Sequence, residues 1–143
     1  MKILHMLNKD DIIKKVKELN FSSDQYLVFS GGSLAAHGIR QTSDVDLVVK
    51  SELFDKLVQT GKWQLTTGKD NTKFLVNDNI EITSQLAWSD YPTTLEEAKS
   101  REILIDGVPF MSLADLIEFK QALGRNKDDK DIELINNYLE AYS

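Results

Sequence analysis

Some segments of this chain have apolar residues at every third or fourth position, and others are short apolar runs. The first pattern predicts helices and the second predicts strands. In Lys9–Leu19 apolar residues recur every three to four positions, which predicts a helix that Asn8 caps. Short helices are also expected at Leu34–His37, stopped by Gly38, and at Glu52–Gln59. Short apolar runs bounded by turn residues predict strands. These runs are Tyr26–Phe29, Val45–Val49, Trp63–Thr66, Lys73–Val76 and Ile80–Thr83.

The last third of the chain predicts a hairpin followed by two helices. Asp106-Gly107 separates the apolar runs Arg101–Ile105 and Val108–Met111, and this dipeptide is a strong hairpin signal. Ser112 is expected to cap the next helix. The apolar face of that helix is Leu113, Leu116, Ile117 and Leu123, and the stripe of the last helix is Ile132, Ile135, Leu139 and Tyr142. The order of elements therefore predicts a mixed α and β fold.

Composition narrows the class of protein. With 143 residues, 41% of them hydrophobic and 28% charged, the chain fits a single globular domain over residues 1–143. The absence of cysteine excludes disulfides and thiolate chemistry, and two histidines argue against a multi-histidine zinc site. A net charge of −6 argues against broad binding to nucleic-acid phosphates. No apolar run approaches the roughly 20 residues of a membrane span, so a cytoplasmic protein without a membrane partner is expected.

Two short motifs predict a site. Gly31-Gly32-Ser33 follows a predicted strand, where close backbone approach and helix-start N–H groups favour a phosphate and Ser33 is expected at the cap position. Asp44 and Asp46 lie two strand residues apart, roughly 6.6 Å between Cα atoms, so their carboxylates share one face. Such a pair can converge on Mg²⁺.

Each motif alone has a simpler explanation, a tight turn with a helix cap or a solvated strand edge. Together they predict a phosphate cradle beside a carboxylate pair, the parts that hold a nucleoside triphosphate and its Mg²⁺.

With Gly38-Ile39-Arg40 and Thr42-Ser43-Asp44-Val45-Asp46-Leu47, the glycine motif resembles the polymerase-beta-like nucleotidyltransferase superfamily. Within it, the small bacterial minimal nucleotidyltransferase and AbiEii-like proteins are the most similar kind. The resemblance continues through Ser112–Leu116, Lys120 and Gly124–Ile132. It implies an α/β fold with a mixed, largely antiparallel sheet flanked by helices, two of them C-terminal. It also implies Mg²⁺-dependent transfer of a nucleoside monophosphate, with AMP from ATP as the expected case, to a hydroxyl acceptor.

The family uses a third carboxylate on a neighbouring strand, and Glu81 is the position that matches it. Ile80 and Ile82 would face the core, which turns Glu81 to the opposite face, although Glu replaces the commoner Asp. Asp78 is the fallback, and an exposed strand residue is the alternative interpretation of Glu81. The resemblance implies that Asp44, Asp46 and Glu81 hold two Mg²⁺ ions and that Glu81 can act as general base.

The resemblance also implies contacts to the nucleotide. Gly31, Gly32 and Ser33 are expected at the phosphates, and four cations are candidates for the triphosphate or the acceptor. These are Arg40, Lys120, Arg125 and Lys127. Arg40 can instead orient the loop before Asp44. Asp128 and Asp131 can be caps or partners of Arg125, and a structural role is the preferred interpretation of Asp131.

The acceptor cannot be derived from these residues. Proteins that the sequence resembles include antibiotic-modifying enzymes and members of toxin–antitoxin or phage-defence pairs, so a partner protein or a homodimer can complete the acceptor site. The alternative function is an antitoxin that works by binding its partner, independently of Asp44 and Asp46. A polymerase or tRNA end-adding enzyme is disfavoured by the length and the net charge of −6.

Overall fold

The computed structural model describes residues 6–142 and contains the predicted elements in their predicted order, with one added α-helix and two short 3-10 helices, Ser23–Gln25 and Lys69–Asn71. The helices are α1 (Lys9–Glu18), α2 (Gly31–Ala36), α3 (Ser51–Thr60), α4 (Leu95–Ser100), α5 (Leu113–Leu123) and α6 (Asn126–Ala141). The strands are β1 (Tyr26–Phe29), β2 (Val45–Val49), β3 (Gln64–Thr67), β4 (Lys73–Asn77), β5 (Ile80–Thr83), β6 (Ile103–Ile105) and β7 (Val108–Phe110).

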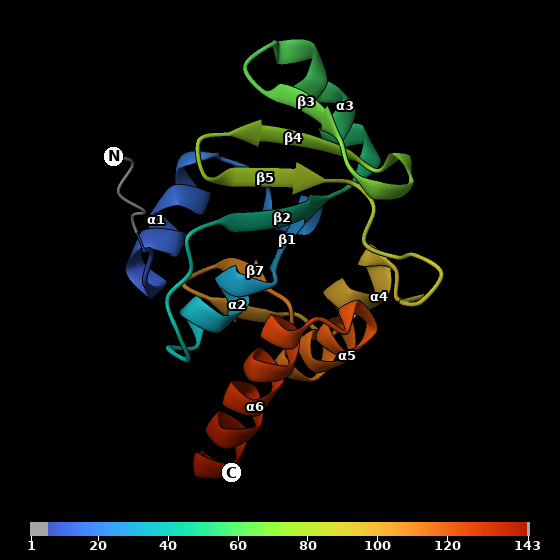
Figure 1. The fold of residues 1–143 in the computed structure, drawn as a ribbon. Coiled ribbons are helices and arrows are strands. Elements are labelled where there is room, and N and C mark those ends of the chain that lie inside the picture. Colours follow the sequence, from blue (N-terminus) through green and yellow to red (C-terminus); the bar gives the residue numbers. More distant parts are fainter. Residues whose placement is uncertain (1–5, 143) are drawn as a thin grey trace, which may run out of the picture.

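The strands of the described residues form one seven-stranded sheet in the order β3-β4-β5-β2-β1-β7-β6 (Figure 1). Strand β1 pairs with β7 and β2 pairs with β5 in parallel, whereas the other four neighbouring pairs are antiparallel. Two helices close the chain. The α/β fold class, with a mixed and largely antiparallel sheet flanked by helices, is therefore confirmed. Within the described part of the chain no helix is long and apolar enough to cross a bilayer.

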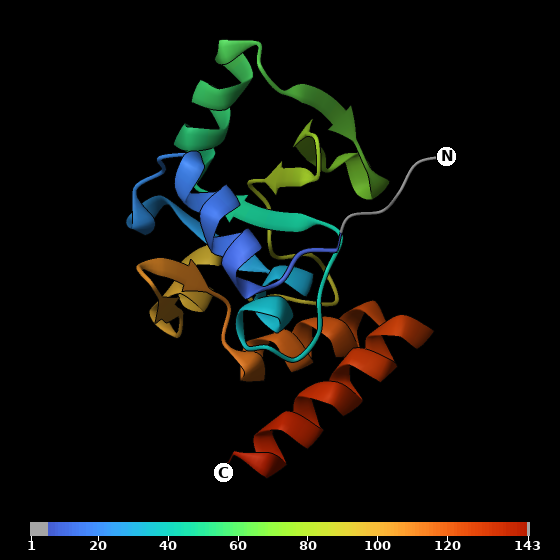
Figure 2. The same ribbon diagram turned by 90° about the vertical axis from the view of Figure 1, so that its left-hand side faces the viewer.

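Two hydrophobic clusters lie on opposite faces of the sheet, and β2 contributes to both. Leu47 belongs to the cluster that α1 and α3 cover, while Val48 belongs to the cluster that α5 covers. Figure 2 shows α1 across one face of the sheet and the pair α5 and α6 beneath it. Because side chains alternate along a strand, Asp46 lies on the same face as Val48 and α5.

Local capping signals account for several helix boundaries. The Asn8 side chain accepts a hydrogen bond from the Asp11 N–H, and Ser112 accepts one from the Asp115 N–H, as the sequence predicts. The added helix, α4, begins at a capping box of Thr94 and Glu97. That Thr-x-x-Glu signal is present in the sequence and marks the start of a helix.

One expectation about a helix boundary is wrong, and the apolar stripe of α6 is only partly buried. Helix α2 begins at Gly31, three residues before the predicted Leu34, so the glycine motif forms its first turn. The apolar stripe of α6 is buried only in its first half: Ile135 is fully buried, but Leu139 is 40% and Tyr142 77% exposed. The 16-residue α6 is longer than the 11-residue α5, and its last turn is more exposed than the turn that holds Ile135.

Candidate active site

The central feature of the site is a pair of carboxylates on neighbouring strands. Asp46 on β2 is the register partner of Glu81 on β5. Ile82 is buried in the core on the opposite face, so Glu81 points away from it as predicted. Asp44 precedes β2 by one residue and is exposed on the Asp46 face. Three carboxylates from two adjacent strands thus face the same side of the sheet.

Burial and like charge raise the pKa values of Asp46 and Glu81. Burial, together with the charges of Glu81 and Asp44, raises the pKa of Asp46 to about 7. Burial and Asp44 also raise the pKa of Glu81. Lys120 and Lys127 act in the opposite direction on Asp46 but do not outweigh these effects. The site therefore carries an excess of negative charge that a bound cation would offset.

The donor chemistry of the three side chains fits a hard cation. Carboxylate oxygens are the ligands that Mg²⁺ prefers, and Asp46 and Glu81 stand side by side on the sheet. As placed, no three His, Asp or Glu side chains within residues 6–142 already form a closed ligand group. Because like charges repel, a cation is needed to draw the three carboxylates together.

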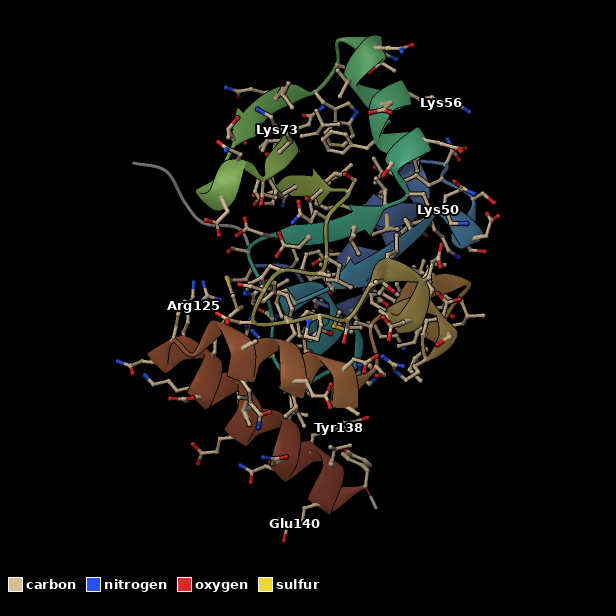
Figure 3. The ribbon with its side chains drawn as sticks, turned by 90° about the vertical axis from the view of Figure 1, so that its right-hand side faces the viewer. Lys50, Lys56, Lys73, Arg125, Tyr138 and Glu140 are labelled. Carbon is tan, nitrogen blue, oxygen red and sulfur yellow. The ribbon has the colours of Figure 1, made fainter. Side chains whose placement is uncertain are left out.

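A polar pocket of about 390 Å³ opens on one side of Asp46 and Glu81. Its walls come from the β1–α2 junction, the loop before β2 and the junction of α5 and α6. Four cations line it: Arg40, Lys120, Arg125 and Lys127. Figure 3 shows Arg125 where α5 passes into α6. The structure thus brings together all four cations that the sequence proposes for the triphosphate.

Beneath the polar pocket, two buried aspartates hold three of the cations. The Lys120 Nζ lies 2.9 Å from an Asp131 carboxylate oxygen and 3.4 Å from an Asp128 oxygen, and its side chain is 3% exposed. Arg40 donates two hydrogen bonds to Asp131, at 2.8 and 2.9 Å. Arg125 donates two to Asp128, at 2.6 and 3.0 Å. The structural role of Asp131 and the pairing of Asp128 with Arg125 are confirmed.

This network keeps both aspartates ionised. Burial acts to raise the pKa of Asp131, but hydrogen bonds from Arg40 and Lys120 outweigh it and hold the pKa below the usual value. Burial likewise opposes ionisation of Asp128, whose pKa is lowered by hydrogen bonds from Arg125 and the charge of Lys120. Lys120 is therefore a buried partner of two anions, while the exposed Lys127 reaches the pocket from its rim.

The glycine motif is placed differently from the prediction. The Ser33 hydroxyl is fully buried and donates to the Val28 carbonyl oxygen at 3.1 Å, so the expectation that it caps the helix beside a phosphate is wrong. A Cβ on Gly32 would lie 2.7 Å from Val28 Cγ1, so Gly32 serves close packing against β1. A Cβ on Gly31 would collide with the Thr42 hydroxyl. Of the three residues, only Gly31 lines the polar pocket.

The actual cap residue, Ser30, is a site residue that the sequence reasoning missed. Its backbone has φ 59° and ψ −133°, a conformation that non-glycine residues rarely adopt. It lies at the turn from β1 into α2 and lines the cavities on both sides of Asp46 and Glu81. The signal that could have found it is the abrupt change from the apolar run Tyr26–Phe29 to glycine.

The second cavity, here called the apolar chamber, has a volume of about 650 Å³. It shares Ser30, Asp46, Glu81 and Arg125 with the polar pocket. Its other walls are largely aromatic and aliphatic, and come from β1, β4, the loop after β5, and α5. They include Phe29, Phe74, Leu86, Trp88, Phe119 and Leu123. Asp46 and Glu81 therefore lie at the boundary between a cation-lined pocket and an aromatic one.

No protein-family model, no curated protein and no solved structure matches this chain.

Proposed function

We propose that this protein is a Mg²⁺-dependent nucleotidyltransferase, which moves a nucleoside monophosphate, AMP from ATP in the expected case, onto an acceptor hydroxyl. The observation that carries the proposal is the position of Asp46 and Glu81, register partners on β2 and β5 that lie between the polar pocket and the apolar chamber. A cytoplasmic location, where nucleoside triphosphates are made and used, is part of the proposal.

The polar pocket suits the triphosphate. Arg40 and Arg125 present guanidinium groups already oriented by Asp131 and Asp128, and arginine makes bidentate contacts with phosphate. Lys127 adds a point charge at the rim. Lys120 is buried and forms ion pairs with Asp128 and Asp131. It would therefore act on the nucleotide through its positive electrostatic potential and not through direct contact.

Asp44, Asp46 and Glu81 would hold two Mg²⁺ ions, which neutralise the triphosphate and lower the pKa of the acceptor hydroxyl when bound. In the transfer step the acceptor oxygen forms a bond to the α-phosphorus. The bond from that phosphorus to the bridging oxygen breaks, and pyrophosphate leaves with the electron pair. The hydroxyl proton passes to the Glu81 carboxylate, which would act as the general base.

Calorimetric titration of nucleoside triphosphates into the purified protein, with and without Mg²⁺, tests this proposal. The variant Asp44→Asn/Asp46→Asn removes two carboxylates from the site. The matched control Glu52→Gln/Asp55→Asn removes two exposed carboxylates from α3. We expect Mg²⁺-dependent binding by the wild type and the control and none by the site variant. Equal binding by all three proteins would contradict the proposal.

A second candidate, an antitoxin-like protein that acts by binding a partner protein or a second copy, is favoured by the exposed outer end of α6. Leu134, Leu139 and Tyr142 are 39%, 40% and 77% exposed there. Figure 3 shows Tyr138 and Glu140 on this outer part of the helix, away from the sheet. Complex formation that survives Asp44→Asn/Asp46→Asn but is lost in Leu139→Asp would support this candidate.

A further inference from the structure

We infer that the apolar chamber is the acceptor site and that the acceptor carries an aromatic ring, neutral or positively charged, beside its hydroxyl. This inference rests on the proposed function and adds the class of acceptor to it.

The direction of attack places the acceptor on the chamber side of the phosphorus. In an in-line displacement the incoming oxygen and the leaving oxygen lie on opposite sides of the phosphorus. The four cations that suit the leaving pyrophosphate all line the polar pocket. Of these four, only Arg125 also lines the apolar chamber. Glu81 lines both cavities. If the α-phosphorus is held at Asp46 and Glu81, the face opposite the leaving group opens into the apolar chamber.

Aromatic rings form much of the chamber wall. The Phe119 ring packs edge-to-face against Phe29 and Trp88, with ring centroids 5.5 Å apart in both pairs. All three rings line the chamber, and Phe74 contributes a fourth from β4. Aromatic rings prefer such stacked and edge-to-face neighbours. A flat apolar group thus fits this wall better than a sugar or another polyhydroxylated acceptor.

The charge of the chamber wall favours a neutral or cationic acceptor. Among the side chains that the structure describes in the chamber wall, four are carboxylates and Arg125 is the cation. Arg125 is already paired with Asp128. With Asp46 and Glu81 occupied by cations, Asp70 and Asp90 remain as exposed carboxylates on this wall. They repel an anionic acceptor and attract a cationic one, and the half-buried Trp88 ring that lines the chamber favours a cation further.

Three phenols of similar size test the inference, because they differ chiefly in charge: tyramine is cationic, tyrosol neutral and 4-hydroxyphenylacetate anionic. Their affinity is measured by calorimetry with the wild-type protein, in the absence of nucleotide and with Mg²⁺-ATP. Transfer of label from [α-³²P]ATP to each phenol is measured separately. We expect tyramine to bind about fivefold tighter than 4-hydroxyphenylacetate.

Two variants locate the binding. Asp90→Asn, in an exposed loop, should bring the affinities of the three phenols together. Phe74→Ala should weaken all three, whereas the control Leu65→Ala, which removes an exposed apolar side chain from β3 outside the chamber, should weaken none.

The possible failures are distinguishable. Absence of phenol binding at millimolar concentration, with Mg²⁺-ATP binding intact, would overturn the acceptor class and leave the proposed function standing. Displacement of tyramine by adenosine would overturn the assignment, because the chamber would then hold the nucleoside. Phenol binding in a protein that does not bind Mg²⁺-ATP would overturn the acceptor role together with the proposed function.

Discussion

Asp46 and Glu81 are register partners in the parallel pair of β2 and β5, and both face away from the core side of the sheet that Leu47 and Ile82 occupy. Burial and the charges of neighbouring carboxylates raise the pKa of both side chains, and the pKa of Asp46 reaches about 7. Such an arrangement is unfavourable to the metal-free fold, since burial and like charge both oppose ionisation. Under the proposed function, a bound cation would offset this cost.

Asp46→Asn is expected to stabilise the metal-free protein above neutral pH. The folded pKa of Asp46 is about 7 and the unfolded value is 3.8, so the folded state retains a proton that the unfolded state releases between these values. The free energy of unfolding therefore falls as pH rises from about 4 to 7, by on the order of 3–4 kcal/mol.

Thermal unfolding in a chelator at pH 5 and pH 8 measures this effect. Because the Asn side chain stays neutral at both pH values, the melting temperature of the wild type should fall by several degrees more than that of the variant between pH 5 and pH 8. The same dependence on pH in both proteins would contradict the assignment of the raised pKa to Asp46.

Lys120→Met is expected to destabilise the protein by about 3–5 kcal/mol, because it leaves the buried carboxylates of Asp128 and Asp131 without their shared cation. Urea unfolding measures the change as a lower midpoint. Lys130→Met, which alters an exposed lysine on the same helix as the two aspartates, is the control and should stay within about 0.5 kcal/mol of the wild type. If the urea midpoint of Lys120→Met equals that of the control, the prediction is wrong. Arg40 and Arg125 would then be enough to compensate the buried charges of Asp128 and Asp131.

Ser33→Ala is expected to cost about 1 kcal/mol of stability and to leave Mg²⁺-dependent triphosphate binding unchanged. The Ser33 hydroxyl donates to the Val28 carbonyl oxygen, which also accepts a hydrogen bond from the Met111 N–H at 2.8 Å, so the carbonyl keeps a partner in the variant. Urea unfolding and nucleotide titration measure the two properties side by side. Lost nucleotide affinity at unchanged stability would instead place the hydroxyl at the phosphates.

Ser30→Gly is expected to raise the free energy of unfolding by about 1 kcal/mol. At φ 59° and ψ −133° a serine side chain is strained, whereas glycine adopts this conformation readily. Ser30→Val, which adds a branched side chain at the same backbone angles, should lower stability. A lower urea midpoint for Ser30→Gly than for the wild type would contradict this expectation. It would show that the serine side chain stabilises the fold by more than its backbone strain destabilises it.

The local features of this chain, namely which side of a strand each side chain faces and where helices begin, can be predicted from the sequence. The period-two pattern of Ile80, Glu81 and Ile82 sets which side chain faces the core and which faces the site, whatever strand lies beside it. The same argument puts Asp44 and Asp46 on one face. Caps such as Asn8 and Ser112 act within four residues of themselves, so they too are legible in the sequence.

The first turn of α2 was not predictable in the same way. Whether a Gly-Gly-Ser segment is a loop or a helical turn depends on what it packs against. Here Gly32 is pressed against Val28, and Thr42 occupies the space beside Gly31. With the backbone this close to β1, the Ser33 side chain turns inward to the Val28 carbonyl and Ser30 becomes the cap.

The phase of each acidic side chain on its own strand, and the mixed order of helices and strands, are therefore local properties that can be predicted from the residues. The pairing of β5 with β2, in the register that joins Glu81 to Asp46, arises only when the chain is folded. Folding also brings Arg40 to Asp131, 91 residues away, and buries Lys120 between two aspartates of the next helix. The physical reason is range: strand periodicity and capping act between near neighbours, whereas sheet order and buried charge pairs arise from the packing of distant segments.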